Sequence, residues 1–593
     1  LETNYPNSPA LLSSKAQFAG YLARSGRTQE ALAAYRDLVG DAQGKPAPAL
    51  RRLLVPFFDL LTSDGDDGAE AAADMFLASQ LLQRPGLAQT QAVLARELSG
   101  GSDEASQLFR KAVNVGRSVE QLRNRVALLE GQAAADPLVA ERLTAQRAAL
   151  AQLETQQLAI QDSLGEYPRF RAVSDGRVTL EELQQTLRPG EGYLKLATLD
   201  GATFAIFATS EMARAYRAGV DPEALEAEVD ELRATIAYVE NGQTLTFPFD
   251  IEKSRALYKA LLEPVDGEVK ALEHLVFEPD GAMLRLPANL LVADDASVDR
   301  YVERIAQGGD DYDFTGTNWL GRDVRITTTV SPSAFRDVRR APGSSAVREY
   351  IGFGENTPLT QERGTLGTRA ALAGGADCLW APSIWDYPIK ADELYAASRS
   401  LGAGTAQERI VTGDTFTDTA VLGMEDLDQY RILHFATHGL VTAPQPECPP
   451  RPALLTSFGD EQSDGLLSFA EIFDLKIDAD LVILSACDTA GEATLGATRE
   501  AGVSGGGFAL DGLVRAFVGA GGRTVVASHW PVPDDYDATN RLIDGFFSVA
   551  AGTSLAEAMR QSQGRLMDQS ETSHPFYWSA FAIVGDGGAQ LRN

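Results

Sequence analysis

Hydrophobic side chains recur along this chain at two spacings. Over roughly the first 165 residues they lie three to four positions apart, and after about residue 190 they form short continuous runs. The first spacing is typical of amphipathic helices and the second of buried strands. Near the N-terminus one apolar helical face consists of Leu12, Ala16, Ala19 and Leu22. Gly26-Arg27 then supplies a turn, and Thr28 is the expected N-cap of a second helix, so the pattern predicts a helical pair over 11–40.

Degenerate copies of this helical pair are predicted over 47–83 and 85–115. The run from Gly26 to Tyr35 resembles a tetratricopeptide repeat, whose period is about 34 residues. Three stacked repeats would bury a shared core and present a concave face on which a regulatory protein can bind. Residues 117–163 are rich in Leu, Ala, Gln, Glu and Arg, which predicts a helical spacer.

From about residue 190 strands are predicted to alternate with helices. Paired strands are expected at Gly192–Leu199 and Ala202–Ala208, followed by a polar helix at 221–240. Further strands are predicted at 273–278, 323–330, 349–354, 430–437, 479–485, 523–529 and 577–584. This alternation predicts an α/β domain with a mostly parallel central sheet, in which functional residues gather at the carboxyl ends of the strands.

Composition excludes several classes of protein. The chain is 44% hydrophobic and 23% charged, as in ordinary globular proteins, and no run of 18 apolar residues predicts a membrane span. A net charge of −31 repels phosphates, so no direct nucleic-acid partner is expected. An odd, sparse set of cysteines argues against a disulfide framework and leaves a thiol free for chemistry: Cys378, Cys448 and Cys487.

Two predicted strands end in residues that carry chemistry. One ends in His438-Gly439 and the other in Cys487. On neighbouring strands, the imidazole can take the thiol proton, and the thiolate is the competent nucleophile. The backbone N–H groups of Gly439 and Cys487 can then form an oxyanion hole. A cysteine at a strand end is also common as a small buried hydrophobe, so spacing alone leaves both interpretations open.

Several motifs follow one another in order along the second half of the chain: His434–Gly439, Asp464–Leu467, Leu484–Ala490, Gly512–Phe517, Val525–Val532 and His574–Phe581. With Phe277–Gly281 upstream, they resemble the CHAT family, a bacterial branch of the caspase–separase class of cysteine peptidases that is often fused to tetratricopeptide repeats. The resemblance implies a caspase-like fold and makes the second histidine of the first motif, His438, catalytic together with Cys487. Their separation is 49 residues (487 − 438), close to the roughly 50 found in caspases.

Departures from the family pattern limit the expectations about specificity. The caspase signature Gln-Ala-Cys-x-Gly is replaced by Ser485–Thr489, so a preference for aspartate is not expected. Asp488, Asp534 and Asp535 are candidates to face a basic P1 side chain, with Trp530 as a candidate pocket wall. The same aspartates can equally cap helices or lie in solvent, and Trp530 can be core. The residues at 490–510, including Arg499, are a candidate site of self-cleavage.

His434 lies four residues before His438, and on a strand the two face the same way. With Cys448 or Cys487 they would offer nitrogen and sulfur ligands to zinc. The spacings Cys-x-x-Cys and His-Glu-x-x-His are absent, so no metal and no other cofactor is predicted. His434 is instead expected to be buried support for its strand.

The predicted organisation is a tetratricopeptide-like region at 1–116, a helical spacer at 117–165 and a CHAT domain at 166–593. Within that domain, a strand-rich part at 166–270 precedes a catalytic part at 271–593. The predicted function is a cysteine endopeptidase that cleaves a protein or peptide in a bacterial defence or cell-death pathway. The alternative is a catalytically silent scaffold whose repeats bind a partner. A cytoplasmic location is expected, although Leu1 in first position leaves a removed signal peptide open.

Overall fold

The described parts of this computed structural model are residues 9–42, 50–63, 68–82, 177–240, 243–359, 380, 382–401, 408–440, 453–459, 463–488, 507–530 and 535–591, with isolated positions between 122 and 153. The chain divides into two units, Leu1–Leu180 and Glu181–Asn593. Predictions outside the described residues concern the third helical pair, most of the spacer, the predicted loop from 490 to 506, and three single residues: Cys378, Cys448 and Asp534. The last four residues of that predicted loop, 507–510, are instead helical.

Helices form the described part of the first unit: α1 (Pro9–Arg24), α2 (Thr28–Asp41), α3 (Leu50–Leu53), α4 (Val55–Ser63) and α5 (Ala69–Ser79). Tyr35 of α2 stacks on Phe57 of α4 with the ring centroids 4.8 Å apart, and its hydroxyl donates to the carbonyl of Leu53. A Cβ on Gly20 would lie 3.2 Å from that hydroxyl, so a small residue suits the contact between α1 and α2. The first predicted pair and the one over 47–83 are thus present as tetratricopeptide-like helices.

The predicted cap of α2 is wrong by one residue. Thr28 is the first helical residue, and Arg27 occupies the N-cap position without a side-chain cap. Gly26, at φ 72°, makes the left-handed turn that ends the preceding helix. Arg27 pairs with Glu30 of the first turn instead, which places a carboxylate near the helix N-terminus.

In the second unit, thirteen strands of the described residues form one sheet. They are β1 (Glu191–Leu199), β2 (Ala202–Thr209), β3 (Ala213–Arg217), β6 (His274–Glu278), β7 (Arg325–Thr328), β8 (Arg348–Gly354), β9 (Glu408–Thr412), β10 (Tyr430–Leu440), β11 (Ala453–Leu455), β12 (Leu466–Ser468), β13 (Leu481–Asp488), β14 (Thr524–Ser528) and β15 (Phe581–Val584). The strand order is β12-β11-β10-β13-β14-β15-β7-β6-β1-β2-β3, with β8 also beside β10 and β9 beside β8.

Two parallel blocks make up most of this sheet. In the first block β9, β8, β10, β13 and β14 run parallel to one another. In the second block β15, β7, β6 and β1 are parallel. The antiparallel pair of β14 and β15 joins the two, so the blocks run in opposite directions. The predicted α/β class with a mostly parallel sheet is confirmed.

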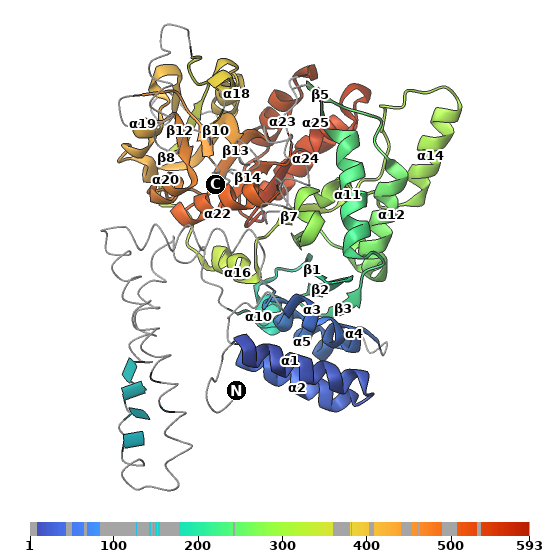
Figure 1. The fold of residues 1–593 in the computed structure, drawn as a ribbon. Coiled ribbons are helices and arrows are strands. Elements are labelled where there is room, and N and C mark those ends of the chain that lie inside the picture. The colour runs from blue at the N-terminus through green and yellow to red at the C-terminus, as the bar shows by residue number, and fades with distance from the viewer. Residues whose placement is uncertain are drawn as a thin grey trace. The chain divides into compact units, whose positions relative to one another are not determined.

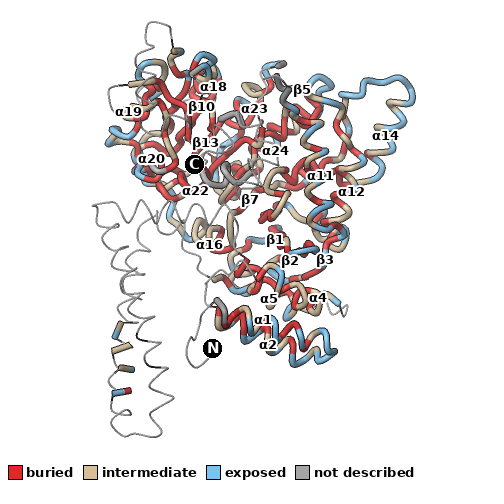
Figure 2. The backbone as a smooth tube through the Cα atoms, viewed as in Figure 1, coloured by how far each residue is buried: buried red, intermediate tan, exposed pale blue. Residues whose placement is uncertain are grey.

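Helices cover both faces of the first block, and Figure 1 shows α18 and α23 on one side of β10 and β13 with α20 and α22 on the other. The α-helices among the described residues of this unit are α10 (Leu180–Thr186), α11 (Pro222–Ile236), α12 (Ile251–Leu262), α13 (Asp266–Lys270), α14 (Asp295–Ala306), α15 (Leu320–Asp323), α16 (Pro332–Arg340), α18 (Asp392–Leu401), α19 (Asp418–Leu422), α20 (Phe469–Asp474), α22 (Gly507–Ala520), α23 (Ala538–Phe547), α24 (Leu555–Met567) and α25 (Pro575–Trp578). Phe435 of β10 packs on Phe517 of α22, and a Cβ on Gly354 of β8 would meet Leu394 of α18 on the opposite face. Because both faces are covered, the strands are buried along nearly their whole length (Figure 2).

Short strands escaped the sequence analysis: β3, β9, β11 and β12 in the main sheet, and the separate hairpin of β4 (Tyr238–Glu240) and β5 (Gln243–Leu245). Four of these six strands, β4, β5, β11 and β12, are only three residues long, which is too short for a hydrophobic pattern to predict them. The helix predicted over 221–240 ends early, at Ile236, because β4 begins at Tyr238.

A buried ionic cluster ties together the amino ends of the second block. Arg339 of α16 donates two hydrogen bonds of 2.9 Å to Glu191 of β1, and His274 of β6 contacts the same carboxylate at 3.0 Å. Arg339 also pairs with Asp586, just beyond β15. Burial raises the pKa of Glu191, but the hydrogen bonds from His274 and Arg339 outweigh it and leave that pKa well below its usual range.

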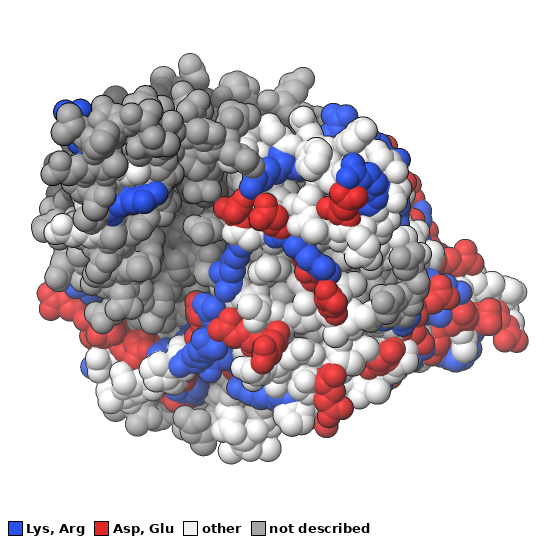
Figure 3. All heavy atoms as spheres, turned by 90° about the horizontal axis from the view of Figure 1, so that it is seen from below, with Lys and Arg blue, Asp and Glu red and all other residues white. Residues whose placement is uncertain are grey.

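On the face of the described residues seen in Figure 3, Lys and Arg side chains alternate with Asp and Glu. The acidic excess of the chain is therefore not concentrated there. A search of the described helices finds none with the length and apolar character needed to cross a bilayer.

Acidification should destabilise the second unit through His574. Burial lowers the pKa of His574 to about 4, although the contact of its Nε2 with the carbonyl of Phe247 acts in the opposite direction. Its Nδ1 accepts from the N–H of Phe576, which only the neutral ring can do. Below pH 6.5 His574 binds a proton in the unfolded chain but stays neutral in the folded chain. The free energy of unfolding therefore falls as the pH drops toward 4, by up to about 1.4 kcal/mol per pH unit. Melting temperatures of the parent and of His574→Gln should therefore converge between pH 7.5 and 5. A constant gap across that range would contradict this linkage.

Candidate active site

The predicted histidine and cysteine occupy paired positions on neighbouring parallel strands. In the β10–β13 pairing, His438 is the partner of Cys487 and Gly439 is the partner of Asp488. Neighbouring strands lie about 4.8 Å apart, and partners in a parallel pair share a face of the sheet. The backbone thus brings residues 438 and 487 to the same face at the carboxyl ends of their strands. The side chains of Cys487 and Asp488 lie outside the described part of the structure.

His438 is oriented by a main-chain carbonyl. Its Nε2 lies 2.6 Å from the carbonyl oxygen of Tyr387. A carbonyl can only accept, so Nε2 carries the proton and donates it. In the neutral ring this leaves a lone pair on Nδ1, which is buried and has no hydrogen-bond partner among the described residues. An unpartnered buried nitrogen is costly in a purely structural histidine, whereas it is the atom that a general base requires.

The electrostatics of the site favour a neutral imidazole. Burial lowers the pKa of His438 below its usual value of 6.5, and the hydrogen bond to the Tyr387 carbonyl offsets this only in part. At neutral pH the ring is therefore ready to accept a proton rather than already charged.

The segment that carries the Tyr387 carbonyl is anchored in a small apolar cluster. Trp385 is 4% exposed, packs on Phe458 and donates its indole N–H to the carbonyl of Thr456. The side-chain amide of Asn356 donates to the carbonyl of Trp385 at 2.9 Å. These contacts hold the backbone two residues from Tyr387, while the Tyr387 side chain itself is 76% exposed.

His434 lies fully buried beneath the site, as predicted. Its Nδ1 contacts the hydroxyl of Tyr350 on β8 at 3.0 Å. Its Nε2 faces a carboxylate oxygen of Glu393 on α18 at 3.3 Å, an ion-pair distance without good hydrogen-bond geometry. The other oxygen of Glu393 accepts from the hydroxyl of Ser485, two residues before Cys487.

The remaining predicted site residues are only partly placed. Gly439 lies on β10 between its pairing partners Leu454 of β11 and Asp488 of β13. Asp535 begins a short turn that follows residues outside the described part. Trp530 is buried and donates its indole N–H to the carbonyl of Phe576, so its ring already belongs to the core.

Sequence reasoning missed the contacts that orient His438 and His434. Tyr387 acts through its main chain, so its side chain carries no signal. Glu393 sits in the first helical turn after Asp392, where acidic residues are common for helix capping alone. Tyr350 is an aromatic residue in an apolar strand, which predicts core and not a hydrogen-bonding role.

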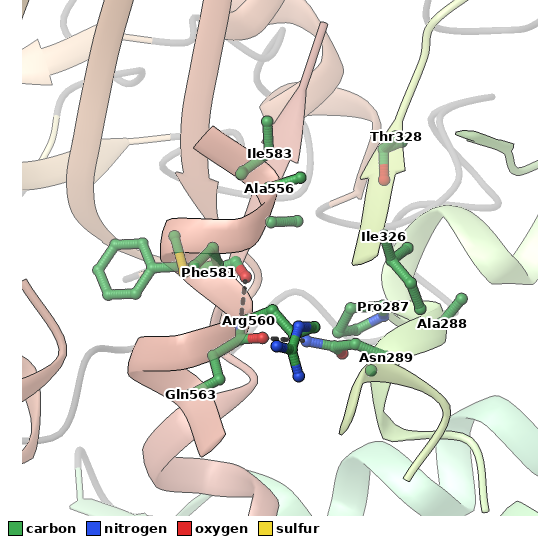
Figure 4. Close-up of a pocket in the computed structure, with 13 residues that line it drawn as sticks. Pro287, Ala288, Asn289, Ile326, Thr328, Ala556, Arg560, Gln563, Phe581 and Ile583 are labelled. Carbon is green, nitrogen blue, oxygen red and sulfur yellow. Dashed lines mark hydrogen bonds between the residues drawn. The ribbon is translucent and has the colours of Figure 1, made fainter. Parts of the chain in front are cut away.

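A small cavity lies elsewhere in the unit, between β7, β15 and α24 (Figure 4). Its volume of about 20 Å³ is enough for one water molecule and too small for a peptide. Asn289, Arg560 and Gln563 line it, and the Oδ1 of Asn289 has no hydrogen-bond partner among the described residues. No lining residue comes from β10 or β13, so the cavity is separate from the candidate site. Within the described part of the chain no group of three or more His, Cys, Asp or Glu is arranged to hold a metal ion.

Comparison with known proteins identifies the family to which this chain belongs and two curated proteins that it resembles. The model of the CHAT domain family matches residues 252–586, more than half of the chain. Tetratricopeptide repeat protein 28 of Homo sapiens is 28% identical over 242 residues, which cover 35% of this chain and 9% of that protein. The Mus musculus protein of the same name is 29% identical over 275 residues, covering 39% and 10%. The chain thus spans about a tenth of the length of these curated relatives.

A solved structure of the Saccharomyces cerevisiae separase–securin complex aligns over 96% of this chain and 44% of that one. Its TM-score is 0.36 at 9% sequence identity, which is too low to support an inference about this chain.

We expect His438 to be an Nε2–H tautomer that titrates below pH 6.5. The Tyr387 carbonyl requires the proton on Nε2, and burial lowers the pKa. Nitrogen-15 NMR of histidine-labelled protein measures both the tautomer and the pKa, and the His438 signal is assigned by its loss in His438→Gln. Tyr387→Ala should leave tautomer and titration unchanged because the carbonyl remains, whereas Trp385→Ala should alter both. An Nδ1–H tautomer in the parent would contradict the assignment.

Proposed function

Because the chain belongs to the CHAT domain family, we propose that it is a cysteine endopeptidase that acts through His438 and Cys487. The family that the motifs predicted is confirmed, and the structure has the predicted α/β domain, which follows tetratricopeptide-like helices along the chain. The catalytic dyad is the part that the proposal adds.

The observation that carries the proposal is the register of β10 and β13, which pairs His438 with Cys487. The hydrogen bonding of the His438 ring supports the proposal. The Tyr387 carbonyl binds Nε2, and Nδ1 is left buried and without a partner among the described residues. A nitrogen in that state can receive the proton of a thiol from the neighbouring strand.

The proposed reaction has two halves. The Cys487 thiol gives its proton to Nδ1 of His438, and the thiolate attacks the carbonyl carbon of the scissile peptide bond. The carbon–nitrogen bond then breaks as the imidazolium returns the proton to the leaving amine, which produces a thioester. In the second half His438 takes a proton from water, the resulting hydroxide cleaves the thioester, and the thiol and a carboxylic acid are released.

The Tyr387 carbonyl has the role of an orienting group in this scheme. Its oxygen holds the Nε2–H side of the ring and stabilises the imidazolium that forms during each half-reaction. The backbone N–H groups of Gly439 and Cys487 are proposed as the oxyanion hole, since both lie at the ends of the strands that carry the dyad. Asp488, Asp534 and Asp535 remain the proposed recognition groups for a basic P1 side chain.

The tetratricopeptide-like helices are proposed to recruit a regulatory protein or the substrate. The relatives bear tetratricopeptide repeats in their name, and stacked repeats of this kind form protein-binding surfaces. The pathway, proposed as bacterial defence or programmed cell death, and the cytoplasmic location rest on the family resemblance alone. The rival function is a silent scaffold, in which the same helices bind a partner and no bond is broken.

Cleavage of a mixed peptide library, read by mass spectrometry, tests the enzyme against the scaffold. The parent chain should cleave, and Cys487→Ala should not, because the nucleophile is gone. His438→Ala should slow turnover by about 10²–10⁴-fold, the usual contribution of a general base. Cys378→Ala, which removes a thiol outside the dyad, is the matched control and should retain the parent rate.

Equal cleavage by the parent and Cys487→Ala would overturn the proposed nucleophile. If the parent and all variants are silent, the same panel is repeated with a thiol-reactive peptide probe. Labelling that is equal in the parent and in His438→Ala would favour the scaffold, because a scaffold has no need for an activated thiol.

The P1 preference tests the acidic pocket. The products of the library should carry Arg or Lys at the cleaved bond, and Asp488→Asn or Asp535→Asn should lower kcat/KM for these substrates by about ten-fold or more, since an ion pair is lost. Glu278→Gln, which removes a buried carboxylate on β6, is a control that should leave the preference unchanged. A preference for apolar or acidic P1 residues would exclude the pocket.

A further inference from the structure

Four buried polar side chains meet on the face of the sheet that α18 covers. They come from four elements: Tyr350 of β8, Glu393 of α18, His434 of β10 and Ser485 of β13. None is more than 5% exposed. Polar groups at this depth are retained when they bond to one another, since each would otherwise lose its hydration without compensation.

Glu393 is the centre of this cluster. One carboxylate oxygen accepts from the Ser485 hydroxyl at 3.0 Å, and the other faces His434 Nε2 at 3.3 Å. On its far side, His434 contacts the Tyr350 hydroxyl through Nδ1. Removal of the Glu393 carboxylate would leave the Ser485 hydroxyl without its acceptor and His434 Nε2 without the charge that it faces. The cluster therefore acts as one unit.

The cluster lies one step below the proposed dyad on both strands. Ser485 pairs with Ala436, and the next residues on the same face are Cys487 and His438. His434 precedes Ala436 on that face of β10. A carboxylate that accepts a hydrogen bond from Ser485 and faces His434 at ion-pair distance thus spans β10 and β13 directly behind the two proposed catalytic positions.

Glu393 also lies close in the chain to Tyr387, whose carbonyl is the third component of the proposed site. It lies six residues after Tyr387, at the start of α18, and the neighbouring Ala391 donates its N–H to the side chain of Glu355 at 3.2 Å. Leu394 of the same turn packs against Gly352 and Gly354 of β8. One buried side chain therefore ties together the segment with the orienting carbonyl, the strand with His438 and the strand with Cys487.

We propose that Glu393 is a positioning residue that, through His434 and Ser485, holds His438, Cys487 and the Tyr387 carbonyl in their reactive arrangement. This inference rests on the proposed dyad and goes beyond it, because it assigns a role to a carboxylate that touches neither substrate nor reacting atoms. Misplacement of reacting groups by about 1 Å costs roughly 10²-fold in rate, so a device for their alignment has a measurable effect.

The positioning role of Glu393 is tested by measuring the reactivity of the Cys487 thiol. In a Cys378→Ser, Cys448→Ser background Cys487 is the sole cysteine, so the rate of its alkylation by iodoacetamide can be measured across pH. Glu393→Gln keeps the shape of the side chain and removes its charge. It should slow alkylation at pH 7 by about ten- to hundred-fold, and move the half-maximal rate toward the pH of about 8.5 that is typical of an ordinary thiol. With a cleaved peptide as substrate, kcat should fall by a similar factor and KM should stay within about two-fold.

The matched control is Glu278→Gln. Glu278 of β6 is also deeply buried and accepts from Tyr193 and Lys195, both of β1 in the second parallel block. Its replacement should lower the melting temperature and leave the alkylation rate and kcat of the folded protein unchanged. Gel filtration selects folded protein for every variant.

Ser485→Ala is the milder variant for the case in which Glu393→Gln does not fold. It should slow alkylation by about three- to ten-fold, and the double variant should be no slower than Glu393→Gln alone, because both changes break one contact. Parent-like alkylation in Glu393→Gln or Ser485→Ala, or additive slowing in the double variant, would overturn the positioning role. An unchanged rate in His438→Ala would instead overturn the dyad itself, so the two failures are distinguishable.

Discussion

The parallel register between β10 and β13 is the constraint on which the candidate site depends. It makes His438 the partner of Cys487 and puts Ser485 beside Ala436. Because side chains alternate between the faces of a strand, a shift of one residue would move the histidine and the cysteine to opposite faces. Both strands are central and covered on each side by helices, so such a shift would also disrupt the packing of their side chains against those helices.

That register matters chemically because of what surrounds His438. The Tyr387 carbonyl takes Nε2, and burial keeps the ring neutral, so the proton-accepting atom can only be Nδ1. The carbonyl is in turn held by the packing of Trp385 and by the amide of Asn356. Beneath it the carboxylate of Glu393 joins the two strands. The proposed chemistry therefore depends on a chain of contacts that starts well inside the core.

The two parallel blocks of the sheet differ in how their buried polar groups are paired. The block with β10 and β13 carries the candidate site, with uncommitted polar atoms such as Nδ1 of His438. The block with β1 and β6 contains buried ion pairs, in which Arg339 and His274 bind Glu191, and Lys195 binds Glu278. A polar group with every partner supplied holds strands together, whereas one left without a partner is available for reaction.

The sequence by itself determined the long elements and the two positions proposed as the dyad. Apolar runs predicted β6, β8, β10 and β13, because buried parallel strands need continuous hydrophobic stretches, and motif order identified His438 and Cys487 within the CHAT family. Three-residue strands such as β11 carry too short a pattern to be recognised, and the cap of α2 moved by one residue to Arg27. Only the tertiary structure decided that the Tyr387 carbonyl contacts His438 and that Glu393 faces His434. A main-chain carbonyl has no side-chain signature, and an acidic residue in a first helical turn resembles an ordinary cap until the fold buries it beside a histidine 41 residues away (434 − 393).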